Sequence, residues 1–253
     1  MDDRLHIISL PVNQISFRES LDRICAWGLE RRSGFVCFAN VHMIIEAHTN
    51  ATFNNLLRKA ALVLPDGQPL ALACRWLYRK KQERISGMDF MPALLQEAHR
   101  LKARVFLYGS TETVLEQLIR KIETTYPGVQ VAGAISPPFR PLSQEELNDH
   151  IDQINRSGAN FVLVALGCPK QETWMALHSE KLHAVLLGLG GAFPVTAGLQ
   201  KRAPVWMQRA ALEWLHRLLQ EPGRLFKRYL YTNLYFIVLL VKAIFRKRKY
   251  RLP

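Results

Sequence analysis

The chain has 253 residues, of which 49% are hydrophobic, and a formal net charge of +13. This length and composition exclude a disordered chain, and one α/β domain with an appendage fits better than two complete domains. Residues 201–253 hold 13 Lys/Arg and 2 Asp/Glu, so they carry a net charge of +11 and leave +2 for residues 1–200. The tail therefore predicts an anionic partner, which is lipid phosphate, nucleic acid or a diphosphate substrate.

No secretory signal is predicted at the N-terminus, because residues 1–13 carry two aspartates and lack a basic segment followed by an apolar run. The expected location is therefore the cytoplasm. Four cysteines, at positions 25, 37, 74 and 168, contain no C-x-x-C pair. Their spacing favours structural thiols over a redox or metal site.

Short runs of β-branched and aromatic residues alternate with amphipathic stretches through the body of the chain. This pattern is typical of βα units and a mainly parallel sheet. Strands are expected at residues 35–39, 62–64, 104–108, 129–134, 161–166 and 184–189. We expect this α/β body to comprise residues 1–202.

Specific signals mark the helices between these strands. Ser16 with Glu19, and Ser143 with Glu146, have the S-x-x-E spacing of a capping box. Pro69 suits the first turn of a helix that runs to about residue 78. Residues 111–125 form a further expected helix, which a Pro-Gly pair closes.

From residue 203 onward the sequence becomes helical and basic. Pro204 is expected to open a helix that continues to residue 221, where Pro222 interrupts it. A second helix is expected from about 225 to 247, and it is apolar along residues 229–241. This run is short against the roughly 20 residues that span a bilayer. Basic residues on both sides predict an interfacial helix on anionic headgroups, and a core or dimer helix with a solvated basic end is the alternative.

Polar residues that directly follow predicted strands are the first candidates for a site, because open α/β sheets bind ligands beyond the carboxyl ends of their strands. Asn40 follows the first of these strands and is either a ligand contact or a helix cap. Asp66 follows the second, within Pro-Asp-Gly. It is either a general base for an attacking sugar hydroxyl or only a turn residue.

Phosphate contacts are expected at two further segments. Arg84, in RISGMD, offers a planar fork of donors, and Asp89 of the same segment is expected to cap the helix that follows. Gly109 and Ser110 end one strand and open a helix, so the backbone amides there suit a phosphate.

Two loops late in the body complete the candidates from residue chemistry. In GCPKQE, Lys170 offers charge, Gln171 offers donors and acceptors, and Glu172 offers a ribose contact, unless the loop is merely solvated. Gly190 and Gly191, in GLGGAF, allow a close backbone approach to a ligand. This loop lacks the third glycine and the later acid of a nicotinamide site.

Several segments taken in series resemble the WecG/TagA/CpsF family of glycosyltransferases in order and spacing, over roughly residues 5–232. They are ANVHMIIEA, LPDGQPLA, RISGMDFMPALL, FLYGS, SPPFRPLSQEE, GCPKQE, GLGGAFPVTAGLQKRAP and EWLHRLLQEPGRLFKRY. Such a set is far more specific than any one of its members.

The resemblance implies an inverting, metal-independent enzyme without a cofactor. Its fold is an α/β, Rossmann-like, mainly parallel sheet flanked by helices, with a helical appendage at residues 203–253 that docks on the membrane. The implied reaction moves N-acetylmannosamine, N-acetylmannosaminuronic acid or another hexose from a UDP-sugar to a polyprenyl-diphosphate-linked saccharide, in cell-surface polysaccharide biosynthesis. The enzyme would work peripherally on the cytoplasmic face of the plasma membrane, either alone or as a homo-oligomer.

The family's motifs also assign roles to residues of this chain. Asp66 matches the general base, which reverses the turn-only interpretation. Arg84 and Gln171 match pocket positions. The appendage arginines expected near the diphosphate are Arg217, Arg224 and Arg228, and the donor is expected over the strand ends near Gly109, Ser110, Pro137, Gln171 and residues 188–193.

Two positions depart from the family's pattern, and two other classes of protein stay open. Phe38 stands where many members carry Thr, and Pro194 where many carry Asp, so a different sugar is an alternative. A nucleic-acid-binding protein would use the basic tail, although no RNA-binding motif is present. A nucleotide-dependent oxidoreductase would need the glycine fingerprint that is incomplete here.

Overall fold

The computed structural model describes residues 4–249, apart from the side chains of residue 224 and residues 247–249. The strands are β1 (Arg4–Ile7), β2 (Leu10–Asn13), β3 (Gly34–Ala39), β4 (Leu62–Pro65), β5 (Arg104–Gly109), β6 (Gln130–Ile135), β7 (Phe161–Ala165) and β8 (Val185–Gly188). The helices of the body are α1 (Phe17–Leu29), α2 (Val41–Thr49), α3 (Ala51–Arg58), α4 (Gln68–Tyr78), α5 (Gly87–Leu101), α6 (Glu112–Thr125), α7 (Gln144–Ser157), α8 (Lys170–His178), the 3-10 turn η1 (Ser179–Lys181) and α9 (Ala192–Thr196). The helices that follow are α10 (Val205–Arg209), α11 (Glu213–Gln220) and α12 (Pro222–Lys249).

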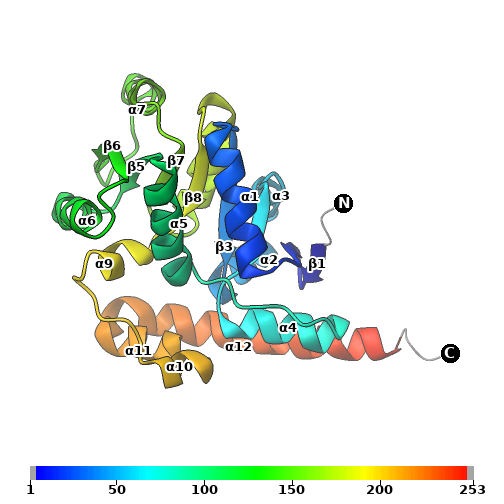
Figure 1. Cartoon of the computed structure of the whole chain (residues 1–253). Helices are drawn as coiled ribbons and strands as arrows, with labels where there is room; N and C mark the ends of the chain where they lie inside the picture. The colour runs from blue at the N-terminus through cyan, green and yellow to red at the C-terminus, as the bar shows by residue number, and fades with distance from the viewer. Residues whose placement is uncertain (1–3, 250–253) are drawn as a thin grey trace.

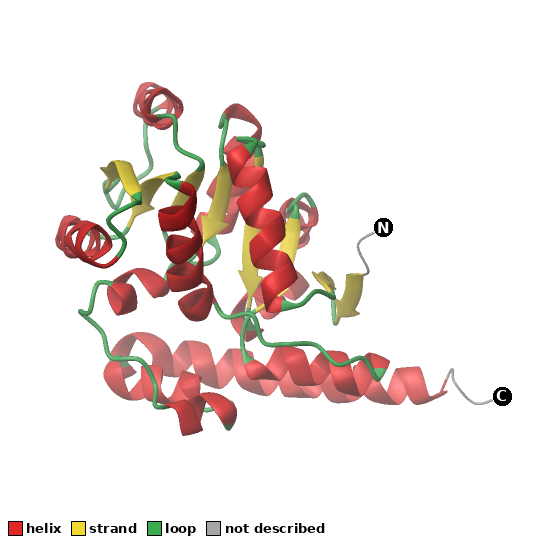
Figure 2. Cartoon of the chain, in the orientation of Figure 1, coloured by secondary structure: helices red, strands yellow, loops and turns green. Residues whose placement is uncertain are grey.

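A parallel six-stranded sheet, in the order β4-β3-β8-β7-β5-β6, lies at the centre of the described chain. Its strands are the six that the sequence predicts, to within one residue at each end. Every residue of β7 is buried, because helices cover both faces of the sheet and leave no polar side to alternate with. The layers are visible in Figure 2, and the predicted α/β class is confirmed.

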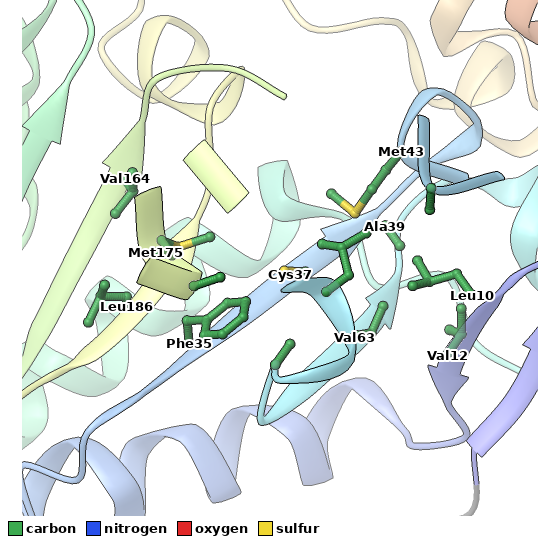
Figure 3. Packing of buried hydrophobic residues seen from close by; sticks show 14 of the residues in the cluster. Leu10, Val12, Phe35, Cys37, Ala39, Met43, Val63, Val164, Met175 and Leu186 are labelled. Atoms are coloured by element: carbon green, nitrogen blue, oxygen red, sulfur yellow. The ribbon is translucent and has the colours of Figure 1, made fainter. Parts of the chain in front are cut away.

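The core is divided by the sheet into two clusters of buried side chains. Phe35 and Cys37 of β3 point into one cluster, where Met175 of α8 and Leu186 of β8 lie beside them (Figure 3). The intervening Val36 of β3 points to the other face, against α1 and α5. Successive residues of a strand alternate between faces, so each strand ties both layers together. Cys25, Cys37 and Cys74 are buried and all four cysteines are free, as the predicted structural role requires.

The antiparallel hairpin β1–β2 was not predicted from the sequence, because each strand has only four residues. It lies against the β4 edge of the sheet. The side-chain Oδ1 of Asn13, in β2, accepts a hydrogen bond of 2.8 Å from the backbone N–H of Val63. Arg4 of β1 donates to the carbonyl of Ala60, just before β4. These side-chain hydrogen bonds attach the hairpin to the sheet in place of backbone hydrogen bonds between β2 and β4.

The predicted helix starts are largely confirmed. Ser143 and Glu146 form the full capping box, and Ser16 accepts from the backbone N–H of Glu19. The predicted cap at Asp89 is wrong. Ser86 caps α5 instead, because the helix begins at residue 87. The side-chain Oγ of Ser86 accepts a hydrogen bond from the backbone N–H of Met88.

The C-terminal helices cross beneath the carboxyl ends of the strands, and α12 forms a long rod at the base of Figure 1. The predicted single helix from Pro204 to residue 221 is wrong. It breaks into α10 and α11 because Ala211 takes a left-handed φ of 61°, which lets the N–H of Leu212 satisfy the carbonyl of Met207. Pro222 ends the preceding helical stretch as expected, but it also starts α12, three residues before the predicted start at 225, since its missing donor has no partner to lose there.

One face of α12 packs on the body and the other is open. Thr232, Phe236 and Leu240 are buried, and the helix lies against α2 and α4. The segment Leu225–Arg246, with a mean hydropathy of 1.3, is long and apolar enough to cross a membrane by length and composition. Its open face carries Phe226, Leu230, Tyr231, Leu234, Ile237, Val238, Val241 and Phe245, all more than a third exposed.

Candidate active site

A cavity of about 440 Å³ lies between the strand ends and the C-terminal helices. One wall comes from residues directly after β3, β4, β5, β7 and β8, and the other from α11 and α12. This is the edge of the sheet where α/β folds bind ligands. Of the residues predicted for the site, those that line it are Asn40, Asp66, Ser110, Gln171, Gly190, Gly191, Arg217 and Arg228.

Asp66 reaches the cavity from the turn that follows β4. Its N–H donates to the carbonyl of Ala39 in β3 at 2.7 Å, which fixes the corner, and Gly67 next to it has a φ of 94°. A side chain is strained at that φ, so glycine is required there. Asp66 is thus both a turn residue and a cavity residue, and the two interpretations left open by the sequence coexist.

The pKa of Asp66 is raised from its usual 3.8 to about 7. Burial is the largest cause, and the carboxylate of Glu213 in α11 is the next. A hydrogen bond with Ser86 and the charges of Arg84 and Arg217 act in the opposite direction. A carboxylate with this pKa holds a proton more strongly than an ordinary aspartate, so it suits proton abstraction near neutral pH.

Asn40 caps α2 and lines the cavity at the same time. Its Oδ1 accepts a hydrogen bond of 3.1 Å from the backbone N–H of Met43. The cap role is therefore established, and the side-chain amide group remains at the cavity wall. The neighbouring departure, Phe38, is buried against Phe90 with 5.1 Å between ring centroids, so this position contributes apolar packing. Pro194 lines the cavity.

The glycines after β8 make room for side chains of the protein itself. A Cβ on Gly191 would lie 2.6 Å from a terminal nitrogen of Arg217, and a Cβ on Gly190 would lie 3.0 Å from Oε1 of Gln171. Both contacts are shorter than van der Waals packing allows. The two glycines therefore leave space for an arginine and an amide of the protein at the cavity wall, and the predicted close approach to a ligand stays a prediction.

Gln171 and Glu172 behave differently although they are adjacent. Gln171 lines the cavity and donates from Nε2 to Oε1 of Glu172 at 2.6 Å. Glu172 is fully buried behind it, and burial raises the pKa of Glu172 to about 7. The predicted ribose contact is thus not met by Glu172 in this structure, because its carboxyl group is buried and accepts a hydrogen bond from Gln171.

Three other predicted contacts lie off the cavity wall formed by the described residues. Lys170 is exposed on α8, Pro137 is half-buried in the loop after β6, and Gly109 is buried against the backbone of Ala165. The amide of Ser110 was expected to receive a phosphate. It donates instead to the carbonyl of Ala165 at 2.8 Å, so Ser110 meets the cavity without that donor.

Arg84 lies outside the cavity lining described here, and its donors already have acceptors. It binds Glu213 at 2.5 Å, Asp89 at 2.7 Å and Gln208 at 3.3 Å. The phosphate contact expected of Arg84 would therefore require these partners to release it.

The C-terminal helices contribute two of the three expected arginines. Arg217 of α11 and Arg228 of α12 both line the cavity, and the guanidinium carbon of Arg228 lies 5.3 Å from the ring centroid of Tyr229. The Nε of Arg228 is buried and has no hydrogen-bond partner among the described residues. The side chain of Arg224 lies outside the described part of the structure.

Sequence reasoning missed Glu213 and His42. Glu213 is four residues before Arg217, so it shares that arginine's face of α11, and this spacing was a usable signal. His42 lines the cavity two residues after Asn40, and burial followed by the charge of Arg228 lowers its pKa. A base of raised pKa facing fixed cations is an arrangement suited to displacing a phosphorylated leaving group.

Comparison with known proteins bears on which reaction this is. The model of the glycosyl transferase WecG/TagA/CpsF family matches residues 5–250. The chain is similar to an N-acetylglucosaminyldiphosphoundecaprenol N-acetyl-beta-D-mannosaminyltransferase of Bacillus spizizenii, with 33% identity over 85% of this chain and 84% of the relative. It is similarly related to the protein of the same description in Bacillus subtilis, with 34% identity over 85% of this chain and 82% of that relative.

The family match covers nearly the whole chain, including the strand ends, Asp66 and the C-terminal helices that enclose the cavity. Both relatives also span most of the sequence, so the likeness is not confined to a generic α/β core. The chain belongs to the WecG/TagA/CpsF family and is a glycosyltransferase.

Proposed function

We propose that the protein transfers N-acetylmannosamine, or a closely related hexose, from a UDP-sugar to a polyprenyl-diphosphate-linked saccharide during cell-surface polysaccharide biosynthesis. The observation that carries this proposal is the shared cavity, which is lined by Asp66 of the body and by Arg217 and Arg228 of the C-terminal helices. The names of both relatives describe transfer of N-acetylmannosamine to an N-acetylglucosaminyl-diphosphate lipid, which supports the choice of transferred sugar and acceptor.

In the proposed reaction Asp66 acts as the general base. Its carboxylate takes the proton from an acceptor hydroxyl while that oxygen attacks the anomeric carbon of the donor. The new C–O bond forms on the face opposite the bond to phosphate, which breaks, so the anomeric configuration inverts. The pKa of about 7 supports this role, because such a group can accept a proton in the transition state near neutral pH.

The leaving UDP carries away the electron pair of the broken bond and needs compensating charge. In the proposal, Arg217 and Arg228 supply it from fixed positions, which is electrostatic preorganisation. The buried Nε of Arg228, without a partner among described residues, is a donor available to an anionic ligand. We further propose that neither a metal ion nor another cofactor takes part.

The C-terminal helices are proposed to hold the enzyme on the cytoplasmic face of the membrane. One side of α12 packs on α2 and α4, while the opposite side exposes a row of apolar residues, so the helix suits a position along the bilayer surface. Arg246, at the end of that row, suits anionic headgroups.

A screen of UDP-sugars with a synthetic lipid-diphosphate-N-acetylglucosamine acceptor tests the proposal, with product mass as the readout. UDP-N-acetylmannosamine should give a product heavier by one N-acetylhexosamine residue. An acceptor that carries a monophosphate in place of the diphosphate is the matched control and should react poorly. Equal products from both acceptors, or none from any UDP-sugar, would contradict the proposed reaction.

A further inference from the structure

Four charged side chains join the body to the C-terminal helices beside the cavity. Arg84 and Asp89 belong to the body, and Glu213 belongs to α11. Arg84 binds Glu213 at 2.5 Å through one terminal nitrogen and Asp89 at 2.7 Å through the other. Arg202, in the segment that leads to α10, binds Asp89 at 2.6 Å.

These side chains are largely withdrawn from solvent, with exposed fractions between 16% and 35%. Ion pairs that are partly buried are strongly geometry-dependent, since a charge left without its partner there is costly. The cluster of Arg84, Asp89, Arg202 and Glu213, which we call the clasp, is thus positioned to hold α11 in one place. If α11 moved away, Arg84 would lose Glu213 and keep Asp89.

Glu213 has a second relationship that the other members of the clasp lack. It lines the same cavity as Asp66, and Arg217 follows it by one helical turn. Its Oε2 is held by Arg84, while its buried Oε1 forms an ion pair of 3.7 Å with Nε of Arg202 that is too long for a hydrogen bond. Both carboxylate oxygens of Glu213 therefore contact arginines of the clasp, which fix this carboxylate at the cavity wall.

We propose that Glu213 is a positioning residue for the transfer reaction: held by Arg84, it brings a second carboxylate to Asp66 when α11 is docked, so that docking prepares the base. This inference rests on the proposed role of Asp66.

Electrostatics give the proposal its direction. Two like charges in a shared, poorly solvated site cannot both ionise easily, so Glu213 increases the affinity of Asp66 for a proton. The groups that oppose it are Ser86 and the guanidinium groups of Arg84 and Arg217, and Arg202 also interacts with Asp66. Undocking of α11 would remove both Glu213 and Arg217 from Asp66 and would expose the carboxyl group to solvent. Because burial and Glu213 are larger influences than Arg217, the pKa of Asp66 would fall and Asp66 would become a weaker base.

The test uses full-length protein in detergent micelles and compares Glu213→Gln with Asp89→Asn. Both substitutions remove one negative charge from the clasp and keep side-chain size. Glu213 lines the cavity with Asp66 and its charge raises the pKa of Asp66, whereas Asp89 lies outside the cavity lining and is not among the charges that shift this pKa. The first readout is the titration of the Asp66 carboxyl carbon by NMR of protein labelled at aspartate. The second is the pH profile of kcat/KM.

The expected result is a lower pKa for Asp66, and an acid limb of kcat/KM shifted to lower pH, in Glu213→Gln. Asp89→Asn should leave the limb near its wild-type position while kcat/KM falls by roughly tenfold, because the helix is held less precisely. If both variants lose activity with no difference in the Asp66 titration, Glu213 is only a structural contact and the proposal is overturned.

The two hypotheses fail in different ways. Should Asp66→Asn retain activity, the proposed base is wrong, and the NMR titration of Asp66 still decides whether Glu213 controls that carboxyl group. Glu213→Gln can keep a hydrogen bond to Arg84, so it is expected to fold. A double variant, Arg84→Gln with Glu213→Gln, avoids an unpaired buried charge if the single variant does not fold. Because the double variant lacks the Glu213 charge, docking of α11 should no longer raise the pKa of Asp66 through that charge.

Discussion

Oε1 of Glu172 accepts a hydrogen bond of 2.6 Å from Nε2 of Gln171, and this contact fixes the orientation of the amide of a residue that lines the cavity. A carboxylate accepts hydrogen bonds, so it selects the amide nitrogen and leaves Oε1 of Gln171 on the other side, beside Gly190. That oxygen has no partner among the described residues. Gln171 therefore offers an acceptor, which suits a sugar hydroxyl or an acetamido N–H.

Substituting Glu172 with Leu should weaken binding of the donor without lowering the stability of the protein. Without its carboxylate, the Gln171 amide loses its fixed orientation, so KM for the donor should rise roughly tenfold while kcat changes less. The melting temperature should stay level or increase, because a buried carboxyl group with one unpaired oxygen is replaced by an apolar side chain. Lys170→Leu, on the exposed neighbour, is the control and should leave KM unchanged. A lower melting temperature with an unaltered KM would contradict this role.

Replacement of Asp66 with Asn should lower kcat by roughly two to four orders of magnitude, since the amide cannot accept the acceptor's proton. Steady-state kinetics with the lipid-linked acceptor measure the effect. Asp152→Asn is a suitable control, because that side chain is 65% exposed on α7. Near wild-type turnover in the Asp66 variant would remove this residue from the role of base.

The raised pKa of Asp66 predicts opposite pH dependences of rate and stability. The base must be deprotonated, so kcat/KM should rise with pH up to about 7. The folded protein binds this proton more tightly than the unfolded chain does. The stabilisation is therefore complete below the usual pKa of 3.8 and is lost as pH rises through about 7.

Urea unfolding at pH 4 and pH 8 measures the stability side of this prediction. Relative to wild type, the free energy of unfolding of Asp66→Asn should be higher at pH 8 than at pH 4 by roughly 1–3 kcal/mol, because only the wild type loses the stabilisation from the Asp66 proton. This is less than the full pKa shift implies, because the Asp66 side chain is only partly buried at the cavity wall. The contribution of Glu172, whose pKa is also raised to about 7, cancels in the comparison. A constant difference at both pH values would show that Asp66 titrates normally.

Addition of one methyl group at Gly191 should disturb Arg217. The Cβ of Gly191→Ala would lie 2.6 Å from the arginine's terminal nitrogen, so the guanidinium must move, and kcat/KM should fall roughly ten- to a hundredfold. Gly223→Ala in α12 is the matched control, because no atom lies within 4 Å of its added Cβ and alanine favours a helix. Equal activity of the two variants would mean that the position of Arg217 is unimportant.

The open face of α12 can be tested with liposomes. Leu234 and Ile237 are 57% and 55% exposed on that face, and replacing both with Glu should reduce sedimentation with anionic vesicles at least severalfold. Leu177, on α8, is 56% exposed and provides the control for added charge at an apolar position. If Leu177→Glu reduces binding to the same extent, the effect comes from net charge and α12 is not the contact.

The sheet was predictable from the sequence because its strands are continuous apolar runs, a strong local signal that burial on both faces produces. The β1–β2 hairpin was missed because four residues give too little periodicity, and side chains such as Asn13 secure it through distant contacts. The break at Ala211 was missed for a related reason. A left-handed φ at alanine is intrinsically unfavourable, so nothing in the local sequence predicts it at this position.

The candidate site shows the same division between local and distant determinants. Asp66 directly follows β4 and Gln171 begins the helix that follows β7, so the rule for parallel sheets placed them at the cavity. Arg84 was expected to contact phosphate because its type fits, yet its three acceptors come from residues 5 to 129 positions away. Pairings across such separations leave no trace in local spacing.

The hydrogen bond from Val63 to Asn13 has a consequence for the rim of the sheet. A strand at a rim presents unpaired backbone groups, to which strands of other molecules can add, and this is a common route to aggregation. By occupying one such group of β4, the N-terminal hairpin shields that rim. β4 leads directly to Asp66. The β1–β2 hairpin does not line the cavity, yet by holding β4 in place it also helps to position Asp66.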